Sequence, residues 1–190
     1  MRPRLILASA SPRRRELLTE AGYEFEVASP RVEESSHGWL TIRELTIWNA
    51  ARKAAAACGI ARDAVILAAD TLVTIDGEVL GKPADFDEAI RMLRRLSGRS
   101  HEVWTGVRIN DARLRKTRSF HEMSRVHFRK LDDRAIRDYL GKIDPLDKAG
   151  AYAIQEWIGV VGIKSVVGDF YNVMGLPVSR VVRELRKFSG

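Results

Sequence analysis

The stretch AVILAADTLVTI, residues 64–75, is the strongest β-strand signal in the sequence. The run is mainly apolar, and the Asp76-Gly77 dipeptide that follows it is the favoured two-residue turn of a β-hairpin. One charged residue, Asp70, interrupts the run. An ionised carboxylate in a buried strand is costly unless it is paired, binds a metal or lies where the strand leaves the core. The stretch therefore predicts a buried strand and a candidate functional residue, and the alternative is that Asp70 caps a nearby loop.

Strand-like runs and amphipathic helical stretches alternate on both sides of this strand, which is typical of an α/β fold. No glycine- or serine-rich linker divides the 190 residues, so a single domain is expected. The predicted helices run from Pro12 to Gly22, from the capping box TIRE (41–44) to Cys58-Gly59, from DFDE (85–88) to Ser97-Gly98, over about 132–140 and over about 177–188. The other predicted strands lie at 4–8 and near 101–109, 117–128 and 158–167.

The segment LASASPRRRELL, residues 7–18, places three arginines where the first predicted helix begins. A helix N-terminus presents unpaired N–H groups and the positive end of the helix dipole, so it favours anions. Because successive side chains are about 100° apart, the three arginines cannot share one ligand. Arg14 lies at the edge of the apolar stripe and is expected to point inward, with Arg13 at the helix tip and Arg15 in solvent. The alternative is a solvated run of charge.

Further charged residues stand out from their surroundings. Lys53 lies in an alanine-rich helical stretch, Lys82 lies in LGKPAD, and Glu33-Glu34 precedes the capping box. Each alone is more typical of a solvated surface. As a set, carboxylates can hold a hard divalent cation, basic side chains can neutralise a polyphosphate, and one carboxylate can take a proton from water. The set predicts phosphoryl or nucleotidyl chemistry.

Composition narrows the class of protein. The 32 Lys and Arg against 25 Asp and Glu give a net charge of +7, which favours anionic partners in general. A single cysteine excludes an internal disulfide and a multi-cysteine zinc site, and it fits a reducing cytosol. The longest apolar runs are far shorter than the roughly 18 residues of a membrane span, and the N-terminus has no signal-peptide pattern, so a cytoplasmic location is expected.

Two further features have a structural interpretation. The basic stretch 113–130 alternates as a strand pair with a charged outer face, so nucleic acid is not expected as a partner. The tryptophans are expected in the core or at dimer contacts, with Trp157 also considered as a stacking surface for a base; they are Trp39, Trp48, Trp104 and Trp157.

The chain resembles the Maf family of nucleoside triphosphate pyrophosphatases over nearly its whole length. The resemblance is carried by six motifs in the family's order and approximate spacing: LASASPRRRELL, AADTLV, GEVLGKP, LSGRSHEVWTGV, DKAGAYAIQ and NVMGLP. It implies one α/β domain over residues 1–190, with a mixed central sheet flanked by helices, a cleft for the nucleotide and a fold related to that of the inosine triphosphate pyrophosphatases. It also implies a cytoplasmic enzyme, commonly a homodimer, that uses a divalent cation such as Mg²⁺ or Mn²⁺.

Residue by residue, the resemblance implies that Asp70 is the catalytic proton acceptor and that Glu34 and Asp70 bind the metal. The catalytic residues that it implies are Asp70, Glu34, Lys53 and Lys82. The positions associated with the triphosphate are Arg14, Lys53 and Lys82, with Ser9 in the loop before them.

Three further positions separate the dTTP/UTP subgroup of the family from its 7-methyl-GTP subgroup. They match Arg13, Thr71 and Gln155, and all three have the dTTP/UTP identities here. The amide of Gln155 could donate and accept toward a pyrimidine edge. The chain departs from the family pattern at Glu33, where many members have aspartate, and at Trp157, where glycine is common.

The leading expectation is hydrolysis of dTTP and UTP to the monophosphate and pyrophosphate by metal-assisted attack of water at the α-phosphorus. Modified pyrimidine nucleotides are a further substrate class. One alternative is a 7-methyl-GTP pyrophosphatase, against which the identities at the three selectivity positions argue. The other is a nucleotide-binding regulator of septum formation in cell division. The intact carboxylates favour catalysis, because a pure sensor has no need for Asp70.

Overall fold

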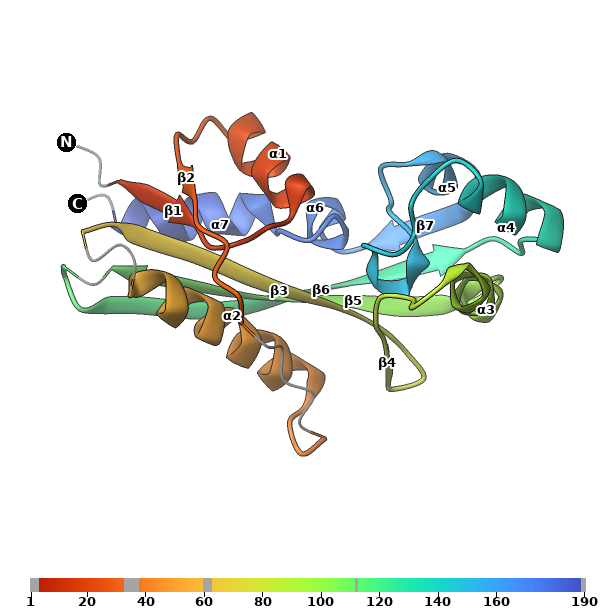
Figure 1. The fold of residues 1–190 in the computed structure, drawn as a ribbon, viewed down its shortest axis with the longest axis horizontal. Coiled ribbons are helices and arrows are strands. Elements are labelled where there is room, and N and C mark those ends of the chain that lie inside the picture. Colours follow the sequence, from red (N-terminus) through yellow and green to blue (C-terminus); the bar gives the residue numbers. More distant parts are fainter. Residues whose placement is uncertain (1–3, 33–37, 60–62, 112, 189–190) are drawn as a thin grey trace. The chain divides into compact units, whose positions relative to one another are not determined.

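The computed structural model of the protein describes residues 4–32, 38–59, 63–111 and 113–188. These residues form an α/β fold with a mixed seven-stranded sheet, in the order β2-β1-β3-β5-β6-β7 with β4 beside β3, and the α/β prediction is confirmed (Figure 1). The strands are β1 (Leu5–Leu7), β2 (Glu26–Val27), β3 (Val65–Ile75), β4 (Glu78–Leu80), β5 (Ser100–Asp111), β6 (Lys116–Phe128) and β7 (Ile163–Val167). The helices are α1 (Pro12–Glu20), α2 (Ile42–Cys58), α3 (Phe86–Leu96), α4 (Asp133–Leu140), α5 (Trp157–Val161), α6 (Phe170–Val173) and α7 (Val178–Leu185), with 3₁₀ turns η1 (Ala149–Ala151) and η2 (Arg186–Phe188).

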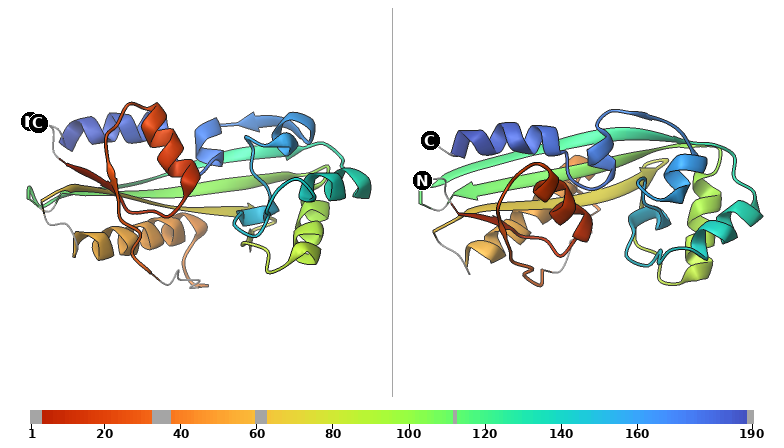
Figure 2. Two further views of the ribbon diagram at one scale, coloured as in Figure 1. Left: turned by 45° about the horizontal axis from the view of Figure 1, so that its top comes forward. Right: turned by 90° about the horizontal axis from the view of Figure 1, so that it is seen from above.

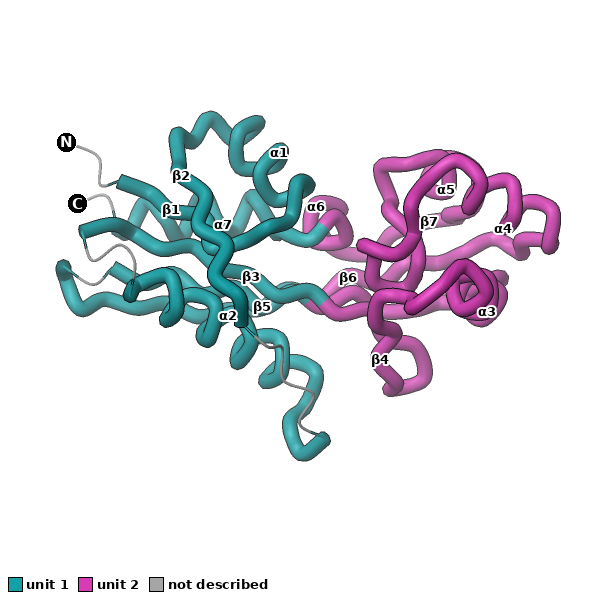
Figure 3. Tube along the Cα trace, in the orientation of Figure 1, with its two compact units in different colours: residues 1–71, 105–122, 175–190 teal, residues 72–104, 123–174 magenta. Residues whose placement is uncertain are grey.

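The chain divides into two compact units (Figure 3). Unit 1 comprises residues 1–71, 105–122 and 175–190, and unit 2 comprises residues 72–104 and 123–174. The expectation of a single domain over residues 1–190 stays a prediction.

In unit 1, β1 pairs in parallel with both β2 and β3. Helix α2 covers one face of the sheet, while α1 and α7 cover the other (Figures 1 and 2). The α2 face is lined by small residues such as Ala54 and Ala57, so the helix lies close to the strands. The approach is very close at Gly106 of β5, where a Cβ atom would lie 2.5 Å from the backbone nitrogen of Ile47. Side chains on the two faces of β3 therefore contact different helices.

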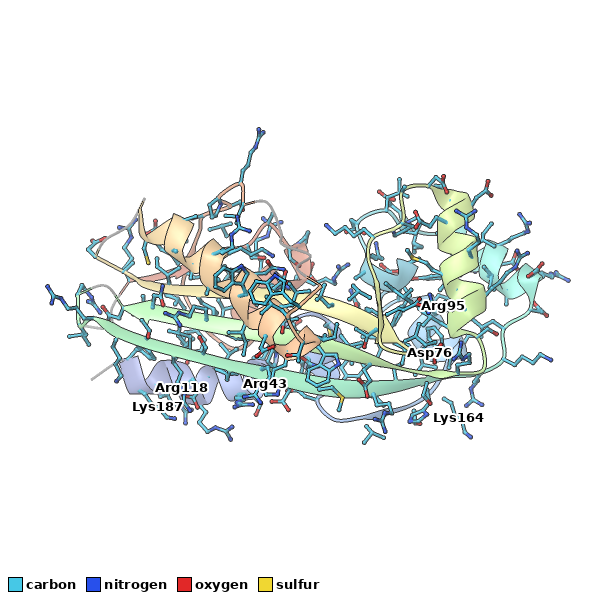
Figure 4. The ribbon with its side chains drawn as sticks, turned by 90° about the horizontal axis from the view of Figure 1, so that it is seen from below. Arg43, Asp76, Arg95, Arg118, Lys164 and Lys187 are labelled. Carbon is cyan, nitrogen blue, oxygen red and sulfur yellow. The ribbon has the colours of Figure 1, made fainter. Side chains whose placement is uncertain are left out.

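The opposite face of unit 1 carries a charged cluster around Glu184 of α7, which is 4% exposed. Its carboxylate accepts from Lys187 at 2.9 Å and lies 3.2 Å from Arg118 of β6, and Figure 4 shows the two cations side by side. The two cations compensate the burial of the carboxylate.

The helix starts follow the local signals in the sequence. In the capping box of α2, Thr41 Oγ1 accepts from the Glu44 N–H at 3.3 Å, while the Glu44 carboxylate accepts from the Thr41 N–H at 2.9 Å. Asp85 and Asp132 cap α3 and α4 through their side-chain oxygens, which accept from the N–H groups of Glu88 and Ala135. Helix α1 begins at Pro12 as predicted.

In unit 2, β4 pairs antiparallel with the end of β3, and β7 pairs antiparallel with β6. The turn between β3 and β4 has positive φ at Asp76 (54°) and Gly77 (79°), as a two-residue hairpin turn requires. Asp76 also accepts two hydrogen bonds from Arg99, both at 2.7 Å. The core of unit 2 lies between α3, α4 and the strands, and Leu93 and Tyr139 are fully buried in it.

The predicted strand near 158–167 is wrong in its first half. The run Trp157–Val161 forms helix α5, and only Ile163–Val167 is a strand. An apolar, β-branched run favours a strand, but this preference depends on context and does not hold here. Gly159 packs directly against the Ile154 carbonyl, a contact closer than any side chain would permit.

Of the two places expected for the tryptophans, the core is excluded for Trp39 and Trp48, whose exposed fractions are 74% and 47%. Both side chains lie at the surface of unit 1, and their expected role in dimer contacts stays a prediction. Among the described residues, none of the helices combines the length and the apolar composition that a membrane crossing requires.

Candidate functional site

The buried charge in β3 is held by one helix. Asp70 is 3% exposed and faces α2, where its Oδ1 accepts from Lys53 Nζ at 2.6 Å and its Oδ2 accepts from Asn49 Nδ2 at 3.1 Å. Lys53 and Asn49 are four residues apart on α2, so they lie on the same face of the helix. The ammonium compensates the burial of the carboxylate, and the two donors fix its orientation. We call these three residues the carboxylate cluster.

Thr71 takes the opposite face of β3, as strand alternation requires, and meets Arg14 of α1. Arg14 is 9% exposed and donates to Thr71 Oγ1 (2.9 Å), to the Ala69 carbonyl (2.9 Å), to Ser9 Oγ (3.2 Å) and to the Gly175 carbonyl (2.8 Å). These bonds tie the start of α1, the loop before it, β3 and the Gly175 segment into one group. The prediction that Arg14 points inward is confirmed.

The exposure of the flanking arginines agrees with the positions expected from helix geometry. Arg13 is half-buried, and Arg15 is exposed. Residues 69–71 of β3 are therefore the junction of two groups. Asp70 belongs to the carboxylate cluster on one face, and its neighbours belong to the Arg14 group on the other. Unit 1 thus brings Lys53 and Asp70 together on one face of β3, and Ser9, Arg14 and Thr71 together on the opposite face.

Two other predicted site residues belong to unit 2. Lys82 is exposed just after β4, and Gln155 is exposed just after the buried Ile154. The N–H of Gly150 donates to the Gly81 carbonyl at 3.0 Å, so the segments that carry Lys82 and Gln155 are joined within unit 2. The expected contacts of these two side chains with a substrate stay predictions.

The predicted metal ligand Glu34 and its neighbour Glu33 lie outside the described residues. Among the residues that are described, no three His, Cys, Asp or Glu side chains gather as a metal site. Asp70 by itself has the chemistry for a hard cation, because proteins hold Mg²⁺ with one or two carboxylates while substrate phosphates supply further oxygens. A carboxylate offers about four lone-pair positions, and its two bonds to Lys53 and Asn49 leave room for such a ligand.

A cavity of about 530 Å³ in unit 1 is lined by other residues, among them Arg4, Tyr23 and Phe188, and none of the predicted site residues lines it. The predicted nucleotide cleft therefore stays a prediction.

Asn49 was missed by sequence reasoning, although it holds one oxygen of Asp70. A polar residue in a helical stretch has many roles, so its type alone gives no signal. The signal that could have found it is its position four residues before Lys53, on the helix face that Lys53 presents to the strand.

Comparisons with known proteins show the family to which the chain belongs. The family described as Maf-like protein matches residues 4–188. The chain is 46% identical over 184 residues to a protein of Pelotomaculum thermopropionicum named dTTP/UTP pyrophosphatase, covering 97% of this chain and 96% of that protein. Proteins of the same name from Cytophaga hutchinsonii (46% identity, 96% of this chain, 83% of that protein) and Bacteroides thetaiotaomicron (45% identity, 96% of this chain, 95% of that protein) are similar. On this likeness along almost its entire length, the chain belongs to the Maf family.

Proposed function

We propose that the protein hydrolyses nucleoside triphosphates, with dTTP and UTP as preferred substrates, to the nucleoside monophosphate and pyrophosphate. The observation that carries the proposal is the buried carboxylate of Asp70, 2.6 Å from Lys53 Nζ. A charged group that is buried and held by fixed donors is preorganised, which is how enzymes place groups that act on a reacting centre. The names of the relatives supply the substrate class.

In the proposed reaction, Asp70 accepts a proton from the water that attacks the α-phosphorus. The bond from the α-phosphorus to the oxygen that bridges it to the β-phosphorus breaks, and pyrophosphate leaves with that oxygen. Lys53 and Asn49 hold the carboxylate toward the reacting centre. A divalent cation, Mg²⁺ or Mn²⁺, bound by Asp70 and Glu34, would supply charge neutralisation of the phosphates.

The remaining predicted residues have proposed roles in binding. Ser9, Arg14 and Lys82 are proposed to contact the triphosphate, and Arg14 also links Ser9 to β3 through its hydrogen bonds. The side chains proposed to select the base are Arg13, Thr71 and Gln155. The protein is also proposed to be a homodimer located in the cytoplasm. Light scattering after size-exclusion chromatography tests the dimer.

The experiment is a substrate panel in ¹⁸O-labelled water. UTP, dTTP and 7-methyl-GTP are incubated with the protein and Mg²⁺, with and without a chelator, and the products are analysed by mass spectrometry. The proposal expects UTP and dTTP to give ¹⁸O-labelled monophosphate and unlabelled pyrophosphate, with loss of activity in the chelator. Labelled pyrophosphate, or free phosphate as the first product, contradicts the proposed bond cleavage. Bound but intact nucleotide would favour a regulator, and a preference for 7-methyl-GTP would favour the other subgroup.

A further inference from the structure

A buried lysine anchors the segment of unit 2 that carries Gln155. Lys148 is 6% exposed, and its Nζ donates to the Asp144 carbonyl and to Asp147 Oδ1, both at 2.6 Å. The same nitrogen lies 3.6 Å from Glu156 Oε1. Lysine is almost never buried unless it is paired, and an ammonium has three donors. The ammonium therefore draws the two ends of the segment 144–156 toward one point.

A second anchor comes from α4. The Tyr139 hydroxyl, fully buried, donates to Glu156 Oε2 at 2.8 Å and accepts from the Ala153 N–H at 3.1 Å. Burial raises the pKa of Tyr139 well above its usual value, so the hydroxyl keeps the proton that it donates. The Trp157 ring stacks on the Tyr139 ring, with 6.3 Å between centroids. The backbone is thus held on both sides of Gln155.

The turn between these anchors has a backbone that needs support. Gly150 and Ala151 have φ values of 71° and 63°, in the left-handed region that is costly for alanine. Such a conformation persists only where its surroundings hold it. The support here includes the Lys148 carbonyl, which accepts from the Ala151 N–H at 3.0 Å, and the Gly81 carbonyl, which accepts from the Gly150 N–H.

We propose that Lys148, Glu156 and Tyr139 are positioning residues that set base selectivity by fixing the backbone on both sides of Gln155, an inference that rests on the proposed function. An amide discriminates between bases only when its donor and acceptor ends have a fixed direction. Gln155 is exposed, so its own surroundings do little to restrict it. The direction of its side chain comes from the backbone, and the backbone is fixed by the buried ammonium, the carboxylate and the hydroxyl.

The test uses three variants of the full-length protein: Tyr139→Phe removes the hydroxyl, Lys148→Met removes the ammonium, and Glu156→Gln removes the charge that pairs with Lys148. Gln155→Ala is the comparator, because it removes the amide itself. Lys164→Met is the matched control, since Lys164 is an exposed lysine of the same unit on β7 (Figure 4). The first readout is amide hydrogen exchange of peptides that cover 149–157. The second is kcat and KM for UTP and for CTP, with circular dichroism as the check on folding.

The anchor variants are expected to exchange faster in 149–157 than the unmodified protein. Their KM for UTP rises about tenfold while kcat stays within about twofold, because the chemistry is unaffected and only the base contact is misplaced. Their preference for UTP over CTP falls toward that of Gln155→Ala, and Lys164→Met behaves like the unmodified protein. Tyr139→Phe removes a single oxygen, so it keeps the test decisive if Lys148→Met does not fold.

Unchanged exchange in both Tyr139→Phe and Glu156→Gln would overturn the inference, and so would faster exchange with unchanged UTP preference in an active enzyme. If the unmodified protein releases no pyrophosphate from either nucleotide, the proposed function fails and the selectivity role fails with it. If the anchor variants are active and their preference for UTP is unaltered, only the positioning role is rejected and the proposed function is retained.

Discussion

Gly106→Ala adds a single methyl group where β5 packs directly against the backbone of α2. A Cβ at this position would lie 2.5 Å from both Ile47 N and Thr46 O, whereas ordinary contact begins near 3.4 Å. The obstructing atoms are backbone, so α2 itself must move by about 1 Å. Overpacking of this kind costs about 1 to 3 kcal/mol of the free energy of unfolding. Because α2 carries Lys53 and Asn49, the same shift displaces both donors from Asp70.

The assay combines thermal unfolding with kcat/KM for UTP. A stability loss of 1 kcal/mol lowers the Tm of a domain of this size by about 2 to 4 °C. A 1 Å misplacement of catalytic groups lowers kcat/KM by about a hundredfold. The matched control is Gly59→Ala at the end of α2, where the added Cβ meets only Ala56 O at 3.4 Å and the φ value is −64°. If Gly106→Ala keeps both Tm and kcat/KM at the level of this control, the argument from close packing is refuted.

Three other predictions concern buried polar groups. Lys53→Met leaves the Asp70 carboxylate buried beside an apolar chain, so urea unfolding is expected to show a loss of about 3 to 5 kcal/mol, and unchanged stability would mean that Asp70 finds another partner. Asn49→Ala removes one donor to Asp70, so the free energy of unfolding is expected to fall by about 1 to 3 kcal/mol and kcat for UTP is expected to fall as well. Equal kcat in the variant and the unmodified protein would show that Lys53 alone positions the carboxylate. Burial lowers the pKa of His101 from 6.5 to about 4, so the unfolded chain takes up the proton first as the pH falls. The free energy of unfolding therefore decreases by about 3 kcal/mol between pH 6.5 and pH 4. His101→Gln, which can still bond the Tyr152 hydroxyl, should flatten this pH dependence of stability, measured by urea unfolding. If the variant and the unmodified protein lose stability in parallel as the pH falls, His101 is not the group responsible.

The parts of the fold that the sequence predicts are those specified by local chemistry. The capping box at Thr41 and the turn at Asp76-Gly77 are satisfied within a few residues, so their sequence signals hold in the structure. Asp70 is also visible in the sequence, because a carboxylate in an apolar strand demands an explanation. The alternation of β3 places Asp70 and Thr71 on opposite faces.

The parts that the sequence does not predict depend on contacts that no pattern in the sequence indicates. The apolar run 157–161 is helical, and Gly159 packs against the Ile154 carbonyl, which no period in the sequence reveals. The role of Asn49 depends on a strand residue 21 positions away. The burial of Lys148 depends on the return of the chain at Glu156, and a lysine in a polar loop otherwise predicts a solvated side chain.

The most direct test of the central claim is turnover by Asp70→Asn under saturating UTP and Mg²⁺, with UTP binding measured by calorimetry on the same preparation. Turnover is expected to fall by about a thousandfold or more, because an amide cannot take the proton from water, while the protein stays folded and still binds UTP. Turnover equal to that of the unmodified protein would remove Asp70 from the reaction.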